Sequence, residues 1–217
     1  MSVRIRRGSA DDAEFLARVM FSASRAHMTR GLWDLIIGAD EAGCLEYLSR
    51  LAIAEPRSLY HYESFLVAEV DGEPAAALCG FETLNAWEVV GDAMAKVQRD
   101  LGWTDADVAA SHFRVAPIWA ACGLPDIGAD FAIESVATLP QYRRRGLIGA
   151  LIHEVLLDAS RRGCRLAQVT TYIGNDTAKW AYEKSGFQPL DEKRCAEVLK
   201  ILGVPGFLRM SAPLKTE

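Results

Sequence analysis

The stretch FAIESVATLPQYRRRGLIG, residues 131–149, carries the strongest structural signal in this 217-residue chain. Its first eight residues are rich in apolar and β-branched side chains and predict a buried strand. Pro140 then ends strand pairing because it has no N–H to donate. Three consecutive arginines, Arg143, Arg144 and Arg145, precede Gly146, where an amphipathic helix begins. Its apolar face contains Leu147, Ile148, Leu151, Ile152, Val155, Leu156 and Ala159.

The segments after this helix complete a recognisable order. Residues 166–173 predict a second buried strand, and residues 176–185 predict another helix that ends at Gly186. The order strand, helix, strand, helix is typical of a parallel pair of strands joined by a crossover helix.

The loop between the first strand and its helix has the chemistry of a phosphate site. The first turn of a helix has N–H groups without internal partners and the positive end of the helix dipole. Gly146 lacks the Cβ that would hold a ligand off the backbone, and the three arginines offer charge-assisted contacts. A basic loop that caps a surface helix would explain the arginines alone. The P-loop and dinucleotide-binding glycine patterns are both missing from the sequence.

A second motif, NDTAKWAYEKSGF at residues 175–187, is independent of the first. Together the two resemble the GNAT superfamily of acyl-CoA-dependent N-acyltransferases, with Arg/Gln-x-x-Gly-x-Gly/Ala and Asn-x-x-Ala-x-x-x-Tyr-x-x-x-Gly-Phe. Arg143, Gly146 and Ile148 occupy the positions of the first pattern, and Ile148 departs from it by carrying a large side chain. The likeness is close over about residues 131–187.

The resemblance implies an α/β (α+β) fold. Its sheet would be mixed, largely antiparallel and twisted, with a central splayed parallel strand pair and helices on its flanks. It also implies a cofactor site for acetyl-CoA in the splay. The residues expected to bind it are Val136, Ala137 and Thr138 through backbone groups, Arg143, Arg144, Arg145, Gly146, Leu147, Ile148 and Gly149 at the diphosphate, and Asn175 at the cofactor arm. Plain core packing would account for residues 136–138, and a turn at the strand end would account for Asn175.

Tyr182 stands where the resemblance places an acid that protonates the departing thiolate. A tyrosine on a helix that faces a strand is more often a core residue, but the motif around Tyr182 favours the acid role.

Glu134 is a candidate base for the incoming amine. A carboxylate inside an apolar strand is costly to bury unless it is paired or functional. A salt bridge or a half-solvated position explains Glu134 equally well. Strict alternation would place Ala132, Glu134, Val136 and Thr138 on one side of the strand and Phe131, Ile133, Ser135 and Ala137 on the other.

The rest of the chain is expected to complete one domain, residues 1–217. Residues 3–7 predict a strand, residues 9–26 a helix, and residues 32–53 a helix with a break near Gly38. Two runs joined by Asp71 and Gly72 predict a hairpin. Residues 84–128 predict a mostly helical insertion, with turns from Pro117 to Gly128. A helix over 192–202 and a strand over 206–212 close the chain.

Composition excludes several classes of function. The net charge of −5 argues against nucleic-acid binding, which needs a surplus of Lys and Arg. The five cysteines and four histidines show no metal-ligand spacing, so no metal site is expected. No apolar run is long enough to span a membrane, and the expected setting is cytoplasmic.

The sequence therefore predicts an N-acetyltransferase that moves an acetyl group from acetyl-CoA to a primary amine of a small molecule or peptide by direct attack. Two alternatives stay open: a non-catalytic acyl-CoA-binding sensor, and a transferase for a longer acyl-CoA. The expected partners are acyl-CoA and an amine acceptor, and a homodimer is compatible with the sequence. The acceptor itself is not readable from it.

Overall fold

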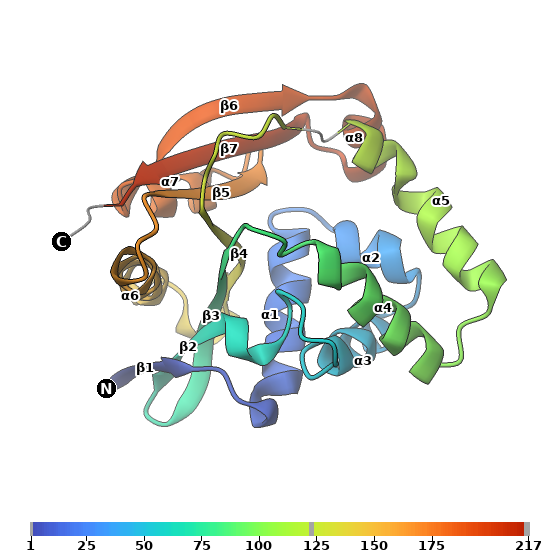
Figure 1. The fold of residues 1–217 in the computed structure, drawn as a ribbon, viewed down its shortest axis with the longest axis horizontal. Helices are drawn as coiled ribbons and strands as arrows, with labels where there is room; N and C mark the ends of the chain where they lie inside the picture. Colours follow the sequence, from blue (N-terminus) through green and yellow to red (C-terminus); the bar gives the residue numbers. More distant parts are fainter. Residues whose placement is uncertain (1, 122–123, 215–217) are drawn as a thin grey trace.

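The computed structural model describes residues 2–121 and 124–214, and its centre is a seven-stranded sheet. The strand order is β1-β2-β3-β4-β5-β7-β6 (Figure 1). The strands are β1 (Val3–Arg7), β2 (Phe65–Val70), β3 (Glu73–Glu82), β4 (Phe131–Thr138), β5 (Leu166–Tyr172), β6 (Gln188–Arg194) and β7 (Gly206–Pro213).

β4 and β5 form the parallel pair of this sheet, and the other neighbours pair antiparallel. Their register runs only from Phe131 opposite Ala167 to Ile133 opposite Val169. Both strands continue past this point, so they separate at their carboxyl ends. The expected fold class is confirmed, including the splay.

Helices cover both faces of the sheet (Figure 1). α6 and α7 pack on one face with the even residues of β2, such as Leu66 and Ala68. The other helices pack on the opposite face, which also buries Phe65 and Val67. The helices are α1 (Ala13–Arg25), α2 (Leu32–Ile37), α3 (Glu41–Leu51), α4 (Glu88–Asp100), α5 (Asp105–Ala121), α6 (Leu147–Arg161), α7 (Asp176–Lys184) and α8 (Ala196–Leu202). No helix in the described residues is long and apolar enough to cross a membrane.

A glycine on β3 lets α6 approach the sheet closely. A Cβ at Gly80 would lie 2.5 Å from a methyl carbon of Val155 on α6 and 3.0 Å from the ring of Phe131. The first distance is shorter than real Cβ contacts and the second is tighter than most, so a larger residue at Gly80 would require Val155 or Phe131 to shift.

Two expectations about the helices were wrong. α5 continues through Pro117 to Ala121, where turns were expected. Proline removes one backbone hydrogen bond near the end of this helix, while the buried Val115 and Ile118 hold the segment against the core. Residues 192–194 were expected in a helix but belong to β6, because pairing with β7 overrides their local propensity.

The expected alternation along β4 was wrong beyond Glu134. The register with β3 shifts between Cys79 opposite Glu134 and Ala77 opposite Ala137, and Ser135 has a φ of 52°. This β-bulge inserts one residue and reverses the facing of the later residues of the strand. Val136 therefore packs with the α6 face of the sheet, whereas Ala137 joins the other face, on which Ala132 lies.

Thr138 changes sides for the same reason. It pairs with Ala76, which belongs to the α6 face, whereas Glu134 pairs with Cys79, which belongs to the other face. Directly opposite residues of an antiparallel pair share a face. Val136 and Thr138 thus do not share the side of Glu134.

Candidate active site

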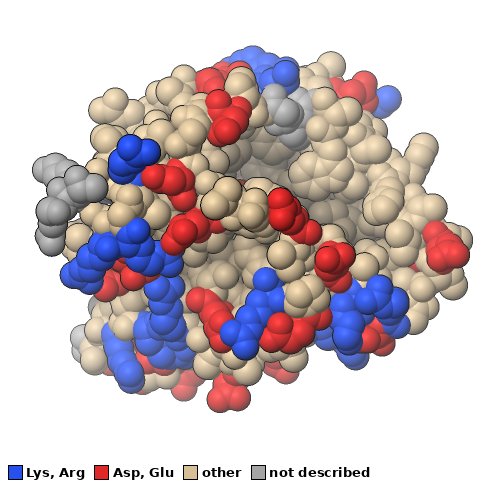
Figure 2. Space-filling view, in the orientation of Figure 1, with Lys and Arg blue, Asp and Glu red and all other residues tan. Residues whose placement is uncertain are grey.

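A cavity of about 660 Å³ opens where β4 and β5 separate. This is an ordinary volume for a small-molecule site. Its walls include residues of both cores, such as Val136 and Ile148 on the α6 side and Trp33 and Phe207 on the other. In the space-filling view, the hollow in the middle of the face is mostly uncharged, and charged residues gather around it (Figure 2). The splay thus connects the two faces of the sheet through one cavity.

One end of the cavity has the features expected of a diphosphate site. Arg143, Arg144 and Ile148 line it, next to the N-terminus of α6. Gly146 has a φ of 76°, which L side chains rarely adopt, and a Cβ at Gly146 or Gly149 would meet no atom within 4 Å. The first turn of α6 is therefore open to a ligand, and its N–H groups and dipole favour an anion. These residues fit the diphosphate of a coenzyme A.

Not every residue expected at the diphosphate lines the cavity. The Arg145 guanidinium lies 5.3 Å from the centre of the Tyr142 ring and donates a hydrogen bond to the Gln141 carbonyl at 3.2 Å. Leu147 is buried in the core under α6. Gly146 and Gly149 contribute open backbone and do not form part of the wall.

Ile148 turns toward the core. Its side chain is half-buried against the α6-side cluster, at the edge of the cavity. The larger side chain at position 148 therefore forms part of the cavity wall, and the backbone at Gly149 stays accessible to a ligand.

The end of β4 borders the same space. Val136, Ala137 and Thr138 line the cavity, and the Thr138 carbonyl accepts a hydrogen bond from Arg143 Nε at 3.4 Å. Because pairing with β5 stops at Ile133, these residues run along the cavity without forming a ladder with β5. An extended ligand arm can lie there as an added strand does.

Glu134 lies in the cavity wall, one residue before the bulge. Burial raises the pKa of its carboxyl from 4.5 to about 7, although the Ser135 N–H donates a hydrogen bond to it and lowers the pKa in part. None of the ion pairs found among the described residues involves Glu134. The salt-bridge explanation for this carboxylate therefore has no support here.

Tyr182 on α7 lies across the splay from β4 and also lines the cavity. Its side chain is buried, with its ring 6.1 Å from that of Phe187 in an edge-on arrangement. Burial raises the pKa of Tyr182 above its usual value of 10, and the negative charge of Glu134 raises it further. The hydroxyl therefore keeps its proton at neutral pH.

Asn175 lines the cavity and also begins α7. Its side-chain oxygen accepts a hydrogen bond from the Ala178 N–H at 3.3 Å, and its amide donates to the Thr171 hydroxyl at 3.2 Å. The helix-capping role is observed directly.

The sequence interpretation treated the tryptophans as packing residues and left the aromatic residues at the other end of the cavity out of the site. Trp33 from α2, Tyr60 from the segment before β2 and Trp119 from α5 all line it. Burial raises the pKa of Tyr60, and the charge of Glu134 raises it further, so Tyr60 faces the same carboxylate as Tyr182. These residues are far apart in sequence and belong to no motif, so only the fold brings them together.

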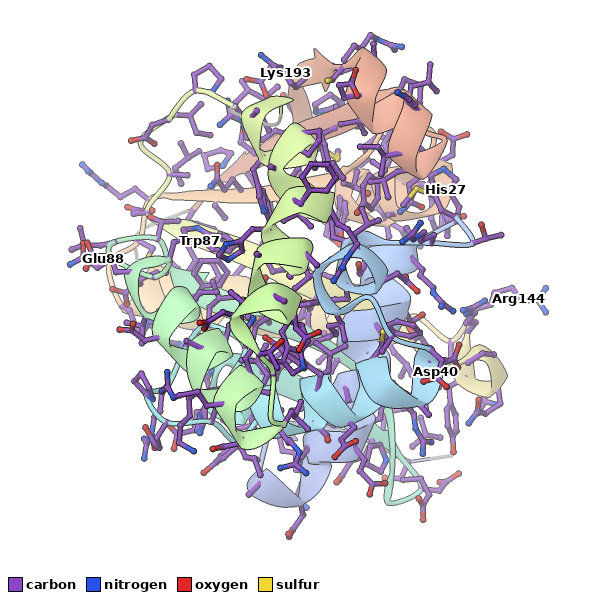
Figure 3. All side chains as sticks on the ribbon, turned by 90° about the vertical axis from the view of Figure 1, so that its right-hand side faces the viewer. His27, Asp40, Trp87, Glu88, Arg144 and Lys193 are labelled. Carbon is purple, nitrogen blue, oxygen red and sulfur yellow. The ribbon has the colours of Figure 1, made fainter. Side chains whose placement is uncertain are left out.

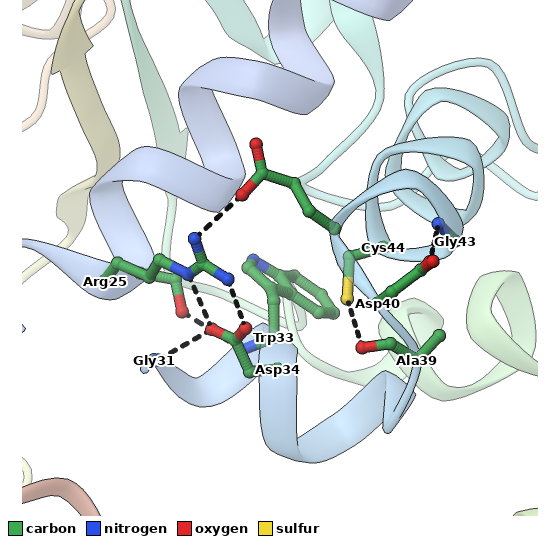
Figure 4. Close-up of polar contacts among 10 residues, drawn as sticks. Arg25, Gly31, Trp33, Asp34, Ala39, Asp40, Gly43 and Cys44 are labelled. Atoms are coloured by element: carbon green, nitrogen blue, oxygen red, sulfur yellow. Dashed lines mark hydrogen bonds and ion pairs between the residues drawn. The ribbon is translucent and has the colours of Figure 1, made fainter. Parts of the chain in front are cut away.

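An ion-pair cluster holds Trp33 in place (Figure 4). Arg25 at the end of α1 donates two hydrogen bonds to Asp34, at 2.7 and 3.1 Å, and one to Glu41 at 3.0 Å. The backbone N–H of Trp33 donates a hydrogen bond to the Ser24 hydroxyl at 3.0 Å. The cluster therefore fixes the start of α2, and with it one wall of the cavity, relative to α1.

The labelled residues of Figure 3 show on which side of the molecule part of the cavity wall lies. Figure 3 shows His27 and Arg144 on one side of the molecule, with Arg144 pointing outward, and Trp87 and Glu88 on the other side. His27 and Arg144 line the cavity, whereas Trp87 and Glu88 do not.

Comparison with known proteins agrees with this geometry. The family model "Acetyltransferase (GNAT) family" matches residues 31–187. A search among curated proteins found no match. A crystal structure of an acetyltransferase has a TM-score of 0.69 at 15% identity and covers 98% of this chain and 100% of its own. An N-acetyltransferase from Staphylococcus aureus Mu50 has a TM-score of 0.65 at 17% identity and covers 97% and 99%.

A Drosophila melanogaster polyamine N-acetyltransferase, described as forming N-acetylagmatine, has a TM-score of 0.55 at 15% identity and covers 98% and 100%. At these identities the solved structures establish the fold alone. The family model spans well over half of the chain, in the region that contains both motifs and most of the cavity. This chain therefore belongs to the GNAT family of acetyltransferases and is an acyltransferase.

Proposed function

We propose that this protein transfers an acetyl group from acetyl-CoA to the primary amine of a small molecule or peptide by direct attack. The observation that supports this most is the placement of Glu134 and Tyr182 around one cavity at the splay of β4 and β5. The Glu134 carboxyl has a pKa suited to accept a proton near neutral pH, and the Tyr182 hydroxyl keeps its proton at that pH.

The basic end of the cavity would hold the cofactor. Arg143, Arg144 and the first turn of α6 would bind the diphosphate, and residues 136–138 would bind the arm that runs toward Glu134. Bound acetyl-CoA would supply a thioester whose carbonyl carbon is attacked by the amine.

Glu134 would remove the proton of the incoming amine. An alkylammonium has a pKa of about 10.4 and no lone pair, so it must first lose one proton to solvent, and the neutral amine then loses a second proton as it forms the new C–N bond. The carboxylate of Glu134, with a pKa of about 7, is about half ionised at neutral pH and accepts that proton directly or through water.

Tyr182 would supply the proton for the other half of the reaction. As the C–S bond breaks, its hydroxyl donates a proton to the departing thiolate sulfur. Glu134 then releases the amine proton and Tyr182 regains one, so the two residues return to their starting states through solvent.

The test is release of free thiol from acetyl-CoA in the presence of an amine panel. Turnover that depends on both substrates, with the acetylated amine confirmed by mass spectrometry, supports transfer. Tight acetyl-CoA binding with no acetylated amine from any panel member would replace the proposal with the sensor alternative. A higher kcat/KM for octanoyl-CoA than for acetyl-CoA would replace it with the longer-chain alternative.

A further inference from the structure

We infer that the acceptor is a primary amine with an apolar, preferably aromatic, body and a single positive charge. This inference rests on the proposed function and names the substrate class for the same site. Its basis is the half of the cavity beyond Glu134 and Tyr182, away from the arginine loop.

The walls of that half are apolar and aromatic. Their large apolar side chains include Leu32, Trp33, Ile36, Tyr60, Trp119 and Phe207. Trp33 and Tyr60 meet edge to face with ring centres 5.0 Å apart, and Tyr172 and Phe207 lie 5.2 Å apart at the other wall. Paired rings of this kind bind a flat apolar group well, because burial and ring-on-ring contact add together.

The charge pattern of the cavity selects against a second cation. Glu134 is the single acidic residue among the described residues that line it. If Glu134 receives the reacting amine, a dication such as agmatine or putrescine has no carboxylate for its other end. Arg143 and Arg144 repel a cation at the cofactor end. A charge buried without a partner loses more by desolvation than it gains from the walls.

The hydrogen-bonding groups in the acceptor half of the cavity do not reverse this selection against a second cation. The Ser24 hydroxyl accepts a hydrogen bond from the backbone N–H of Trp33, and the other hydroxyl residues that line the cavity, such as Ser22 and Thr170, are neutral. None of them supplies the negative charge that a second ammonium group needs once it is buried.

Trp119 offers a matched pair of variants. Its side chain is 54% exposed and lines the cavity, so Trp119→Ala removes part of the acceptor wall without opening the core. Trp87 is also 54% exposed but does not line the cavity, which makes Trp87→Ala the control. Trp119→Glu adds the second carboxylate that the cavity lacks.

The experiment measures kcat/KM with acetyl-CoA for phenethylamine, hexylamine, putrescine, agmatine and a peptide with a free N-terminus. We expect phenethylamine to exceed both dications by at least about tenfold, the scale of discrimination by apolar pockets. Trp119→Ala lowers kcat/KM for phenethylamine by about tenfold and Trp87→Ala leaves it unchanged. Trp119→Glu shifts the preference toward putrescine and agmatine.

A second measurement separates this inference from the proposed function. Calorimetry of phenethylamine and agmatine is performed on the wild-type protein saturated with coenzyme A, where no reaction occurs. If no amine is acetylated but phenethylamine binds more tightly than agmatine, the proposed function fails and the ligand class stands. If dications or the peptide are turned over or bound better than phenethylamine, the ligand class is overturned and acetyl transfer stands.

Discussion

Glu134 on β4 and Tyr182 on α7 face one cavity, and after burial itself the charge of Glu134 is the second cause of the raised pKa of Tyr182. The two residues are distant in the sequence and lie on either side of the strand separation. A base and an acid are thus held at one opening, each with a pKa that suits its proposed task.

Replacing Tyr182 with phenylalanine removes the proposed acid and keeps the ring packed against Phe187. We expect kcat to fall by about 100-fold or more, the usual contribution of general acid catalysis, because the thiolate leaves without a proton. The KM for acetyl-CoA should change little. Steady-state thiol release measures both.

The control for that variant is Tyr62→Phe. Tyr62 is partly buried outside the cavity, so the same chemical change there should leave kcat unaffected. Equal kcat values for wild type and Tyr182→Phe would remove the acid role from Tyr182.

The ionisation of Glu134 should appear in the pH profile. Because burial raises the pKa of this carboxyl to about 7, the basic form is lost as the pH falls below that value. At saturating substrates we expect kcat to decrease by about tenfold per pH unit below about 7 and to level off above it. Activity between pH 5 and 9 with a substrate of constant ionisation provides the profile.

Two variants test whether this inflection belongs to Glu134. In Glu134→Gln, the kcat profile should have no inflection near pH 7, and kcat itself should be much lower than in the wild type. Glu88 lies outside the cavity, on the side of the molecule opposite His27 and Arg144, so Glu88→Gln should keep the wild-type profile. An inflection near 7 that persists in Glu134→Gln would assign it to another group.

The arginine loop should control cofactor affinity. Arg143 and Arg144 border the open first turn of α6, and charge-assisted bonds to a diphosphate are among the strong ones. The double variant Arg143→Ala, Arg144→Ala is expected to weaken acetyl-CoA binding by about tenfold to 100-fold. Added salt should reduce this difference in affinity between the variant and the wild type, because it screens the charges. Calorimetry at two salt concentrations measures this.

The matched control removes the same charge elsewhere. Arg18 on α1 is exposed and Arg161 lies in the last turn of α6, so their double alanine variant should bind acetyl-CoA as the wild type does. Loss of affinity in both double variants would point to net charge and not to a diphosphate site.

The ion-pair cluster at Asp34 should contribute to stability and to the acceptor wall. Burial alone raises the pKa of Asp34, but hydrogen bonds from Arg25 and Gly31 outweigh it and hold the pKa below 3.8. Asp34→Asn is expected to lower the free energy of unfolding by about 1–3 kcal/mol at pH 7 and to raise the KM for the amine through Trp33. Urea unfolding and kinetics test the two effects.

The lowered pKa of Asp34 determines how its contribution to the free energy of unfolding changes with pH. The stabilisation by ionised Asp34 is present above the unfolded pKa and is lost as the pH falls through the lower folded value. The difference between wild type and Asp34→Asn should therefore shrink in acid. Glu46→Gln, which breaks an exposed pair with Arg50, should cost less than about 1 kcal/mol at any pH.

The sequence alone determined the central unit of this protein. Local signals predict the segment from residue 131 to residue 173, which contains a strand, the arginine loop, a helix and a second strand. These signals are the apolar periodicity, the proline that ends the first strand and the glycine at the start of α6. The positions of Tyr182 and Asn175 on α7 came from a short motif in the same region. Such features are readable because their causes lie within a few residues of one another.

Tertiary structure decided the rest. The bulge at Ser135 depends on how β4 pairs with β3, so strict alternation placed Val136 and Thr138 on the wrong side. β6 forms because β7 lies beside it, despite a sequence that suggested a helix at 192–194. Trp33, Tyr60 and Trp119 meet at the acceptor end because α2, the segment before β2 and α5 pack around one opening. Pairing and packing act between residues far apart in the chain, and no local pattern records which of them will meet.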